Sequence, residues 1–263
     1  MKKIWMAYTM LLLLLFLPFL AGCQQQEEDQ GATITITVSA AASLSDVLQE
    51  LKTLFEENHP NIQITYNFGS SGALQQQILQ GAPVDLFFSA AEDKMTELIE
   101  MGQVDPANRV DLIGNEIVLV IPQTSSQNIR SFQDLKEQAR VVSIGTPESV
   151  PAGKYAKEML EHIGVWNELE DKMVYAKDVR QVLMYVETGN VDAGIVYKTD
   201  AISSSKVQVV MSAEEGTHAP ILYPLGIIND RPHDQEVALF YQFLQTDQAK
   251  TVFEKFGFTP LRP

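Results

Sequence analysis

The sequence predicts an α/β fold, and three observations predict it. From Thr33 onward, short β-branched runs alternate with amphipathic helical segments, and only a few residues separate one from the next, which is the pattern of α/β domains. This region has about 230 residues, enough to bury a core as one large or two smaller domains. The single cysteine, Cys23, lies before it, so the core must be stable without a disulfide.

Nine segments combine β-branched and apolar residues over the length of a strand. They are Ile34–Val38, Ile62–Phe68, Val84–Ser89, Ile117–Ile121, Val141–Ile144, Val174–Ala176, Ala193–Val196, Val207–Met211 and Leu222–Ile228. Apolar residues at helical spacing occupy eight other segments. They are Leu44–Glu57, Ala73–Leu79, Lys94–Met101, Phe132–Glu137, Gly153–Ile163, Arg180–Thr188, and Asp234–Gln245 continuing into Gln248–Phe256. In the first of these helices, one apolar stripe runs from Leu44 to Phe55, so we expect it to pack on a sheet.

The N-terminus has the features of a secretory signal. Lys2 and Lys3 precede an eleven-residue apolar run at 10–20, and small residues follow it; such a run is too short to span a bilayer permanently. Residues 20–23, Leu-Ala-Gly-Cys, resemble the bacterial lipobox, in which the cysteine takes a diacylglycerol and becomes the mature N-terminus. We therefore expect residues 1–22 to be a lipoprotein signal peptide, with a cleaved signal and an incidental cysteine as the alternative.

The start of the mature chain predicts a membrane anchor. Residues 23–32 are polar and acidic, so we expect a disordered tether. Two acyl chains on Cys23 would hold the protein stably outside the cell membrane, giving an extracytoplasmic, membrane-anchored protein. Removal of residues 1–22 leaves 17 basic and 34 acidic residues, a net charge of −17. That charge excludes binding of nucleic acid or an anionic lipid surface through general electrostatics.

Small residues dominate three junctions between a predicted strand and the next helix, at 39–43, 69–72 and 149–153. Ligands of open α/β sheets bind at this edge of the sheet, and the first N–H groups of a helix attract anions. The junctions therefore predict an anion site. The alternative at each junction is a helix cap, and Ser43 with Asp46 resembles a capping box.

Several motifs carry a more specific resemblance. They are SAAASL (39–44), FGSSGAL (68–74), GAPVDLFFSA (81–90), TPESVPAGKYAKE (146–158), KDVRQVL (177–183), GIVY (194–197) and FEKFGF (253–258). Together, and in order, they cover essentially the whole mature chain. They resemble the substrate-binding protein of the bacterial molybdate ABC transporter, a family with a periplasmic-binding-protein-like fold. No single motif suffices, because junctions like SAAASL also occur in related oxyanion-binding proteins.

The resemblance implies a two-lobed periplasmic-binding-protein fold. Each lobe would be a mixed, mostly parallel sheet flanked by helices, and a two-strand hinge would join the lobes. We expect residues 33–114 and 224–263 to form lobe I and residues 115–223 to form lobe II. The chain would cross between them near Gly114–Asn115 and Tyr223–Pro224.

The resemblance also implies a ligand, its binding residues and a partner. The ligand is molybdate, and tungstate with it, delivered to an ABC permease by a monomer. The implied binding residues are Ser43 and Ser71 from lobe I and Ala152, Val179 and Tyr197 from lobe II. Family members often carry three hydroxyl residues where this chain has Ser70-Ser71-Gly72, so the assignment between Ser70 and Ser71 is open. We expect no cofactor, no metal other than the molybdenum of the oxyanion, and no enzymatic activity.

Elementary chemistry supports this set of ligands. Four backbone N–H groups and three hydroxyls would supply seven hydrogen-bond donors to the four oxygens of a tetrahedral dianion. Four helix starts, each carrying about half a positive charge, would offset the dianion without a lysine or arginine. Such a pocket selects fully deprotonated anions, because the proton of hydrogen phosphate would leave a donor unpaired. A binding protein for sulfate or another tetrahedral oxyanion is therefore the alternative.

Three other features have competing interpretations. Residues 69–73 nearly match the nucleophile elbow G-x-S-x-G, so a serine hydrolase using Ser71 is a further alternative, but no histidine is singled out as its base. The four histidines also lack the spacing of metal ligands. We expect Arg180 to be an exposed residue at a helix start, balanced by Asp178, rather than a guide for the anion.

Overall fold

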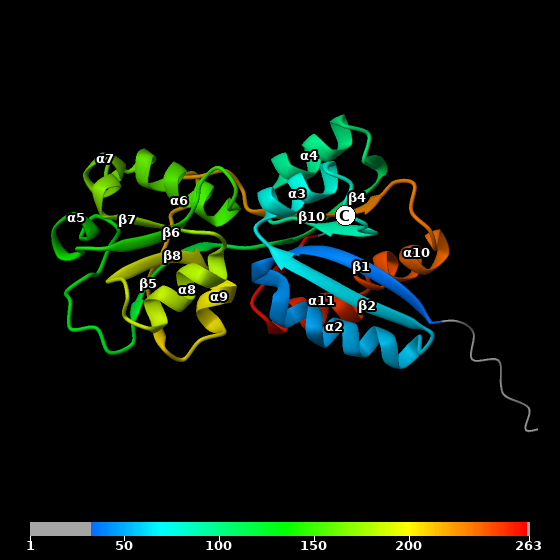
Figure 1. Cartoon of the computed structure of the whole chain (residues 1–263). Helices are drawn as coiled ribbons and strands as arrows, with labels where there is room; N and C mark the ends of the chain where they lie inside the picture. Colours follow the sequence, from blue (N-terminus) through cyan, green and yellow to red (C-terminus); the bar gives the residue numbers. More distant parts are fainter. Residues whose placement is uncertain (1–32, 262–263) are drawn as a thin grey trace, which may run out of the picture. The chain divides into compact units, whose positions relative to one another are not determined.

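Two β-sheets, each covered by helices on both faces, organise the chain (Figure 1). The computed structural model describes residues 33–261. The six-stranded sheet has the order β11-β4-β10-β3-β1-β2, and the five-stranded sheet has the order β7-β6-β8-β5-β9. The six-stranded lobe consists of residues 33–114 and 222–261, and the five-stranded lobe of residues 117–212. The predicted two-lobed α/β fold is confirmed.

The strands of the first sheet are β1 (Ile34–Ala41), β2 (Ile62–Gly69), β3 (Leu86–Phe88), β4 (Val104–Gly114), β10 (Leu222–Ile228) and β11 (Thr259–Pro260). Those of the second are β5 (Ile117–Pro122), β6 (Val142–Gly145), β7 (Met173–Ala176), β8 (Ala193–Tyr197) and β9 (Val207–Ser212). The α-helices are α2 (Ser45–Asn58), α3 (Ser71–Leu79), α4 (Glu92–Glu100), α5 (Leu135–Gln138), α6 (Pro151–His162), α7 (Trp166–Leu169), α8 (Val179–Glu187), α9 (Lys198–Ile202), α10 (Asp234–Phe243) and α11 (Asp247–Lys255). Two short 3-10 helices, η2 (Ala42–Leu44) and η3 (Glu170–Lys172), complete the described elements.

Both sheets are mixed, but parallel pairing is confined to part of each. In the first sheet β1 pairs in parallel with β2 and β3, whereas β10 is antiparallel to β3 and β4. In the second sheet β6 is parallel to β7 and β8, whereas β5 is antiparallel to β8 and β9. The expectation of mostly parallel sheets was therefore too strong, because the strands next to the crossings join their sheets in the opposite direction.

The chain crosses between the sheets twice. It leaves β4 at Gly114 and enters β5 at Ile117, and it returns between Ser212 and Leu222. The two connections touch, because the Asn115 N–H donates to the Ile221 carbonyl at 3.3 Å. The return point predicted at Tyr223–Pro224 lies inside β10, where Tyr223 already pairs with Ile113.

Every predicted strand and helix is present, with bounds that differ by a few residues. The sequence did not predict β4, β11, α7 or α9. The predicted continuation of α10 into α11 is interrupted at Thr246, whose hydroxyl accepts a hydrogen bond from the Ala249 N–H at 3.2 Å and so starts a new helix. The predicted signal peptide, tether and lipidated Cys23 lie outside the described residues.

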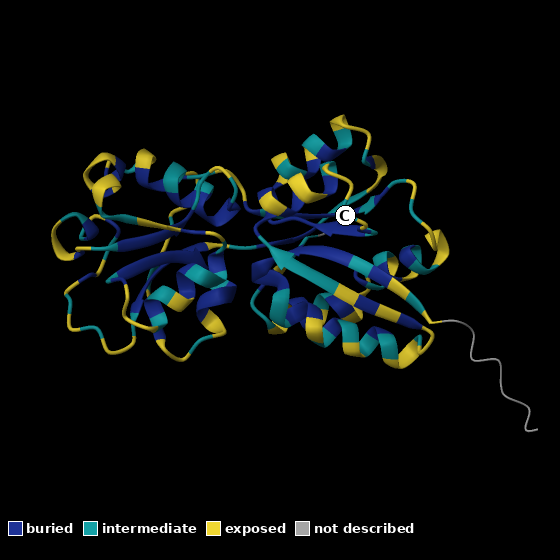
Figure 2. Cartoon of the chain, in the orientation of Figure 1, coloured by how far each residue is buried: buried dark blue, intermediate teal, exposed yellow. Residues whose placement is uncertain are grey.

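The central strands of both sheets are buried, whereas the edge strands β2, β7 and β9 and the outer faces of the helices are partly exposed (Figure 2). Residues 117–120 of β5 are completely buried. In α2 the buried side chains are Val47, Leu48, Leu51 and Phe55, the stripe that the sequence predicts. Among residues 33–261, no helix has the length and apolar character needed to cross a membrane.

Candidate anion-binding site

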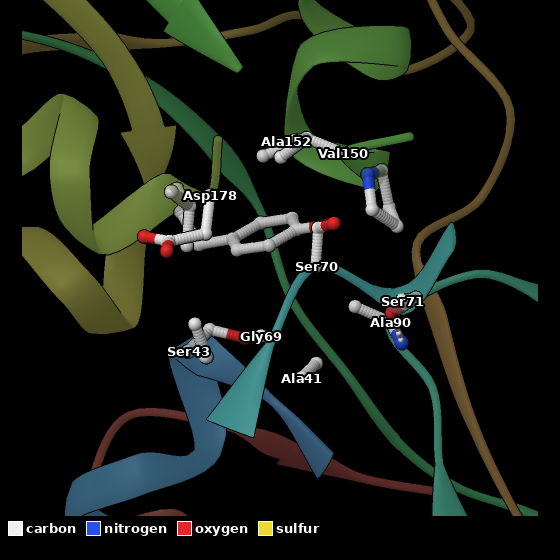
Figure 3. A pocket seen from close by; sticks show the side chains of 13 residues that line it. Ala41, Ser43, Gly69, Ser70, Ser71, Ala90, Val150, Ala152 and Asp178 are labelled. Carbon is white, nitrogen blue, oxygen red and sulfur yellow. Dashed lines mark hydrogen bonds between the residues drawn. The ribbon is translucent and has the colours of Figure 1, made fainter. Parts of the chain in front are cut away.

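Residues from both lobes line one small pocket (Figure 3). The six-stranded lobe contributes Ala41, Ala42, Ser43, Gly69, Ser70, Ser71 and Ala90. The five-stranded lobe contributes Val150, Pro151, Ala152, Asp178, Val179 and Tyr197. All five residues predicted to bind the anion are in this lining. None of the lining residues is a lysine, an arginine or a histidine.

The fold brings these residues together because each follows the carboxyl end of a strand. Ser43 lies in η2, directly after β1, and Ser71 is the first residue of α3, after β2. The ends of β1 and β2 are adjacent, since Ala41 pairs with Gly69. In the other lobe, Ala152 and Val179 are the second and first residues of α6 and α8, and Tyr197 ends β8.

Three α-helices begin at residues that line the pocket, α3 at Ser71, α6 at Pro151 and α8 at Val179. The first N–H groups of α3, α6 and α8 have no acceptor within their own helices, and each start carries a partial positive charge. Ser43 lies in a 3-10 turn rather than at an α-helix start, so three α-helices contribute instead of the four expected. Asp178 lowers the contribution of α8, because its carboxylate caps that helix by accepting from the Gln181 N–H at 2.8 Å.

The two serines of the 70–71 pair have different partners. The Ser70 hydroxyl caps α3, accepting from the Ala73 N–H at 3.4 Å. The Ser71 hydroxyl is completely buried and accepts from the Ala90 N–H at 2.9 Å. Because a backbone N–H can only donate, Ser71 keeps its own proton available for the pocket. Within residues 33–261 the Ser71 hydroxyl makes no hydrogen bond to a histidine or a carboxylate, so the nucleophile-elbow interpretation has no support in this geometry.

Ser43 does not form the predicted capping box. The first turn of α2 has no side-chain cap, and the Ser43 hydroxyl instead contacts the Tyr223 hydroxyl at 3.0 Å. Asp46 is drawn away from Ser43 by Arg180, whose Nη2 lies 2.9 Å from its carboxylate. Ser43 therefore lies between the pocket on one side and Tyr223 on the other.

Tyr197 carries the one hydroxyl of the pocket lining that has no hydrogen-bond partner in the described part of the chain. The residue is 1% exposed, and burial raises the pKa of its hydroxyl well above the ordinary value. The hydroxyl therefore stays protonated and can donate. An unpaired buried hydroxyl costs about 1–3 kcal/mol, so the arrangement favours an acceptor in the pocket.

Three contacts join the lobes around the pocket. The Gly72 N–H donates to the Ser149 carbonyl at 3.0 Å, and a Cβ built on Gly72 would lie 2.7 Å from that oxygen. Arg180 pairs with Asp46 across the cleft, and Lys154 pairs with Asp93 at 3.3 Å.

The predicted pairing of Arg180 with Asp178 is wrong. Asp178 is occupied as the cap of its own helix, while Arg180 binds Asp46 and, at 3.4 Å, the buried Asp200. Asp46 and Asp200 are far from Arg180 in sequence, so spacing alone pointed to the nearer acid. The Arg180 side chain is absent from the pocket lining, in agreement with the expectation that it does not hold the anion.

Sequence reasoning missed two polar residues behind the pocket, Tyr223 and Asn115. Asn115 donates to the Tyr223 hydroxyl at 3.1 Å and to the Thr199 hydroxyl at 2.9 Å. Ser43 and Tyr223 are 180 positions apart, and neither Asn115 nor Tyr223 lies in a recognisable motif. Only their location beside the crossings of the chain could have drawn attention to them.

Within residues 33–261 no cluster of three or more histidine, cysteine or acidic side chains could hold a metal ion.

Residues 36–259 match the model of a protein family described as bacterial extracellular solute-binding protein. The chain belongs to this family. The position of the pocket between two lobes is consistent with an extracellular solute-binding protein.

Individual relatives extend that result. The solute-binding protein is 53% identical to the putative ABC transporter substrate-binding lipoprotein YvgL of Bacillus subtilis, over 91% of this chain and 92% of the relative. It is 37% identical to the molybdate-binding protein ModA of Escherichia coli, over 85% of this chain and 88% of ModA. Among solved structures, the substrate-binding domain of a putative molybdenum ABC transporter from Clostridium difficile matches 87% of this chain and 100% of its own, with 37% identity and a TM-score of 0.68.

Proposed function

We propose that this protein captures molybdate, and tungstate with it, outside the cytoplasmic membrane for delivery to an ABC permease. The observation that carries the proposal is the convergence of Ser43, Ser71, Ala152, Val179 and Tyr197 on one pocket. Relatives that carry molybdate or molybdenum in their names support it, at 37% identity over most of the chain.

The donors of this pocket suit a tetrahedral dianion. Four backbone N–H groups and the hydroxyls of Ser43, Ser71 and Tyr197 supply seven donors to four anion oxygens. Of the two candidate serines, Ser71 is favoured as the ligand, because the Ser70 hydroxyl caps α3 whereas the Ser71 proton remains free. Neutral donors and helix starts, rather than a cationic side chain, would balance the charge of the anion.

Selectivity follows from the protonation state of the anion. Hydrogen phosphate carries a proton that needs an acceptor, and a donor facing that proton stays unpaired at a cost of about 1–3 kcal/mol. Molybdate and tungstate are fully deprotonated near neutral pH, as is sulfate. Sulfate is smaller, so the fit of the closed pocket must separate it from the other two. A sulfate-binding protein is therefore the second candidate function, and a calorimetric titration with both anions decides between the two.

The cellular setting completes the proposal. Lipidation of Cys23 would anchor the protein, which acts as a monomer and needs no cofactor. The name of the Bacillus relative, a substrate-binding lipoprotein of an ABC transporter, supports both the anchor and the permease. Replacing Cys23 by Ser should release a protein that still binds ligand into the soluble fraction, because the acyl chains alone hold it. A Cys23→Ser protein that stays on membranes would contradict the anchor.

Calorimetric titration of the mature protein tests the ligand. We expect one-to-one binding of molybdate and tungstate with similar affinity. Sulfate should bind at least about 100-fold more weakly, because a loose fit lengthens several charge-assisted hydrogen bonds. Phosphate should show no measurable binding. Sulfate binding as tight as molybdate would favour the second candidate. Phosphate binding as tight as molybdate would contradict the argument from neutral donors.

A further inference from the structure

A chain of hydrogen bonds leads from the crossing between the lobes to the pocket. Asn115, in the connection between β4 and β5, contacts the hydroxyl of Tyr223 in β10 at 3.1 Å, and that hydroxyl contacts Ser43 at 3.0 Å. Tyr223 is completely buried and Ser43 is 5% exposed. Water therefore has little access to the contact between Tyr223 and Ser43, whose polar atoms depend on the partners that the protein supplies, whereas Asn115 is half-buried and also lines a second pocket.

The orientation of the Asn115 side chain is determined by its neighbours. Its Oδ1 faces the Glu116 N–H at 2.9 Å, and since a backbone N–H can only donate, the atom that faces it must be the oxygen. The NH2 group then directs its two protons to the hydroxyls of Tyr223 and Thr199. Asn115 thus donates to one hydroxyl in each lobe.

The direction of the next hydrogen bond follows. Tyr223 has one proton. Asn115 donates to its oxygen, and Ser43 lies 3.0 Å away. The Tyr197 hydroxyl is also a neighbour of Tyr223, but it makes no hydrogen bond of regular geometry with it. If Ser43 donated to Tyr223, the tyrosine proton would be buried without an acceptor, which costs free energy. The favoured arrangement has Tyr223 donating to Ser43. The Ser43 proton is then free to point into the pocket.

We propose that Asn115 and Tyr223 are positioning residues that make Ser43 a donor, and that they thereby determine selection against protonated anions. The inference rests on the proposed function, since it concerns the same pocket. Ser71 provides an internal contrast, because the backbone N–H of Ala90 sets its direction and no side-chain replacement can reverse it. Of the two serine hydroxyls, only that of Ser43 has its direction set by side chains.

The variant Asn115→Asp reverses the direction of these hydrogen bonds without changing the shape of the side chain at position 115. A carboxylate oxygen replaces the NH2 group and accepts the proton of Tyr223, the Tyr223 oxygen then accepts from Ser43, and Ser43 presents a lone pair to the pocket. Titration at pH 8 compares molybdate with inorganic phosphate, which is then mainly the hydrogen phosphate dianion. We expect molybdate affinity to fall about 10- to 100-fold and the ratio of molybdate to phosphate affinity to fall at least 10-fold.

A double-mutant cycle separates this effect from the added negative charge. In the Tyr223→Phe background, Asn115→Asp still introduces a carboxylate but the relay is absent, so the substitution should leave the ratio of affinities unchanged. Tyr223→Phe alone, which removes one oxygen, should lower molybdate affinity about 3- to 10-fold and weaken discrimination against phosphate. Tyr66→Phe is the matched control, because Tyr66 donates to the Leu48 carbonyl at 2.9 Å in the same lobe and away from the pocket.

Two outcomes would overturn the inference. One is an unchanged affinity ratio in folded Asn115→Asp protein together with unchanged discrimination in Tyr223→Phe. The other is a ratio that changes equally with and without the Tyr223 hydroxyl, which would assign the effect to charge alone. Failure of the proposed function is distinct from both, because the unmodified protein would then not bind molybdate at all.

Discussion

The two lobes supply the pocket in different ways. In the six-stranded lobe, the hydroxyls of Ser43 and Ser71 already have partners behind the pocket, Tyr223 and the Ala90 N–H. In the five-stranded lobe, the Tyr197 hydroxyl is buried and has no partner within the described residues. The six-stranded lobe therefore presents hydroxyls that a partner already holds in place while their protons remain free, whereas the five-stranded lobe presents a hydroxyl that has no partner among the described residues.

This difference indicates where the dependence of closure on the ligand originates. A closed form without an anion would bury the Tyr197 hydroxyl unpaired, at a cost of about 1–3 kcal/mol. An anion that contacts both lobes removes that cost and adds contacts that only the closed form provides, so binding shifts the population toward it. Four sets of substitutions test this difference between the lobes.

The largest effect is expected where the lobes come closest, at Gly72. In Gly72→Ala the added Cβ would lie 2.7 Å from the Ser149 oxygen and 2.8 Å from its Cα, and neither backbone can move without opening the cleft. Overpacking of this kind costs about 1–3 kcal/mol, so molybdate affinity should fall about 5- to 150-fold. Calorimetry measures it, and small-angle scattering should show less compaction on adding ligand. Ala73→Ser is the control, because Ala73 is the next residue and is exposed. If Gly72→Ala protein became as compact on adding ligand as the unmodified protein, this contact would have no role in closure.

Tyr197→Phe tests the unsatisfied donor directly. The variant loses one hydrogen bond to a charged partner, worth about 1.5–3 kcal/mol, so molybdate affinity should fall about 10- to 150-fold. Without ligand, the same change removes an unpaired buried hydroxyl, so the melting temperature should be unchanged or higher. Tyr175→Phe, on a side chain exposed at the surface of the same lobe, should change neither quantity. A variant that is less stable without ligand would mean that the hydroxyl is already satisfied.

Asp200 extends the comparison to the pH dependence of the five-stranded lobe. This carboxyl is completely buried next to Arg180, and burial raises its pKa to about 7. The folded protein then binds a proton that the unfolded chain releases near pH 4, so this group makes the free energy of unfolding fall as the pH rises from about 4 to about 7. Asp200→Asn removes the titration. The variant should gain stability relative to the unmodified protein between pH 5 and pH 8, by about 1–3 kcal/mol; a difference that does not depend on pH would exclude this titration.

The smallest effects are expected where the lobe offers backbone amides. Ala152→Gly and Val179→Ala keep the N–H groups that would hold the anion, so molybdate affinity should change less than about threefold, the scale of a surface substitution. Calorimetry of these variants beside Tyr197→Phe makes the comparison. Losses as large as that of Tyr197→Phe would show that side-chain packing, rather than amide donation, forms this side of the site.

The sequence predicted the parts of the fold that have local patterns. Apolar periodicity located α2 and the buried strands, and the small-residue junctions located the pocket. β4 was missed because residues 105–108 are exposed, lack β-branched residues and include Pro106. Such a stretch is tolerated because β11 pairs with β4 only at Ile113 and Gly114, which leaves this part of β4 as an edge.

The contacts that the sequence could not predict are those between distant segments. Arg180 lies two positions from Asp178, yet it binds Asp46, 134 positions away. Ser43 lies three positions before Asp46, yet its hydroxyl contacts Tyr223. In both cases the pairing predicted from the local sequence was chemically reasonable. The actual partner comes from another lobe or strand, and the spacing of residues in the sequence does not reveal it.

The two ion pairs that cross the cleft have the same polarity. The acids Asp46 and Asp93 belong to the six-stranded lobe and the bases Arg180 and Lys154 to the five-stranded lobe, on side chains that are 32% to 43% exposed. Pairs this exposed contribute up to about 1 kcal/mol each, and dissolved ions screen them over about 8–10 Å at physiological ionic strength. The proposed donors to the anion are neutral and buried. Ionic strength is therefore expected to act mainly on the equilibrium between open and closed lobes, with a dilute medium favouring the closed form.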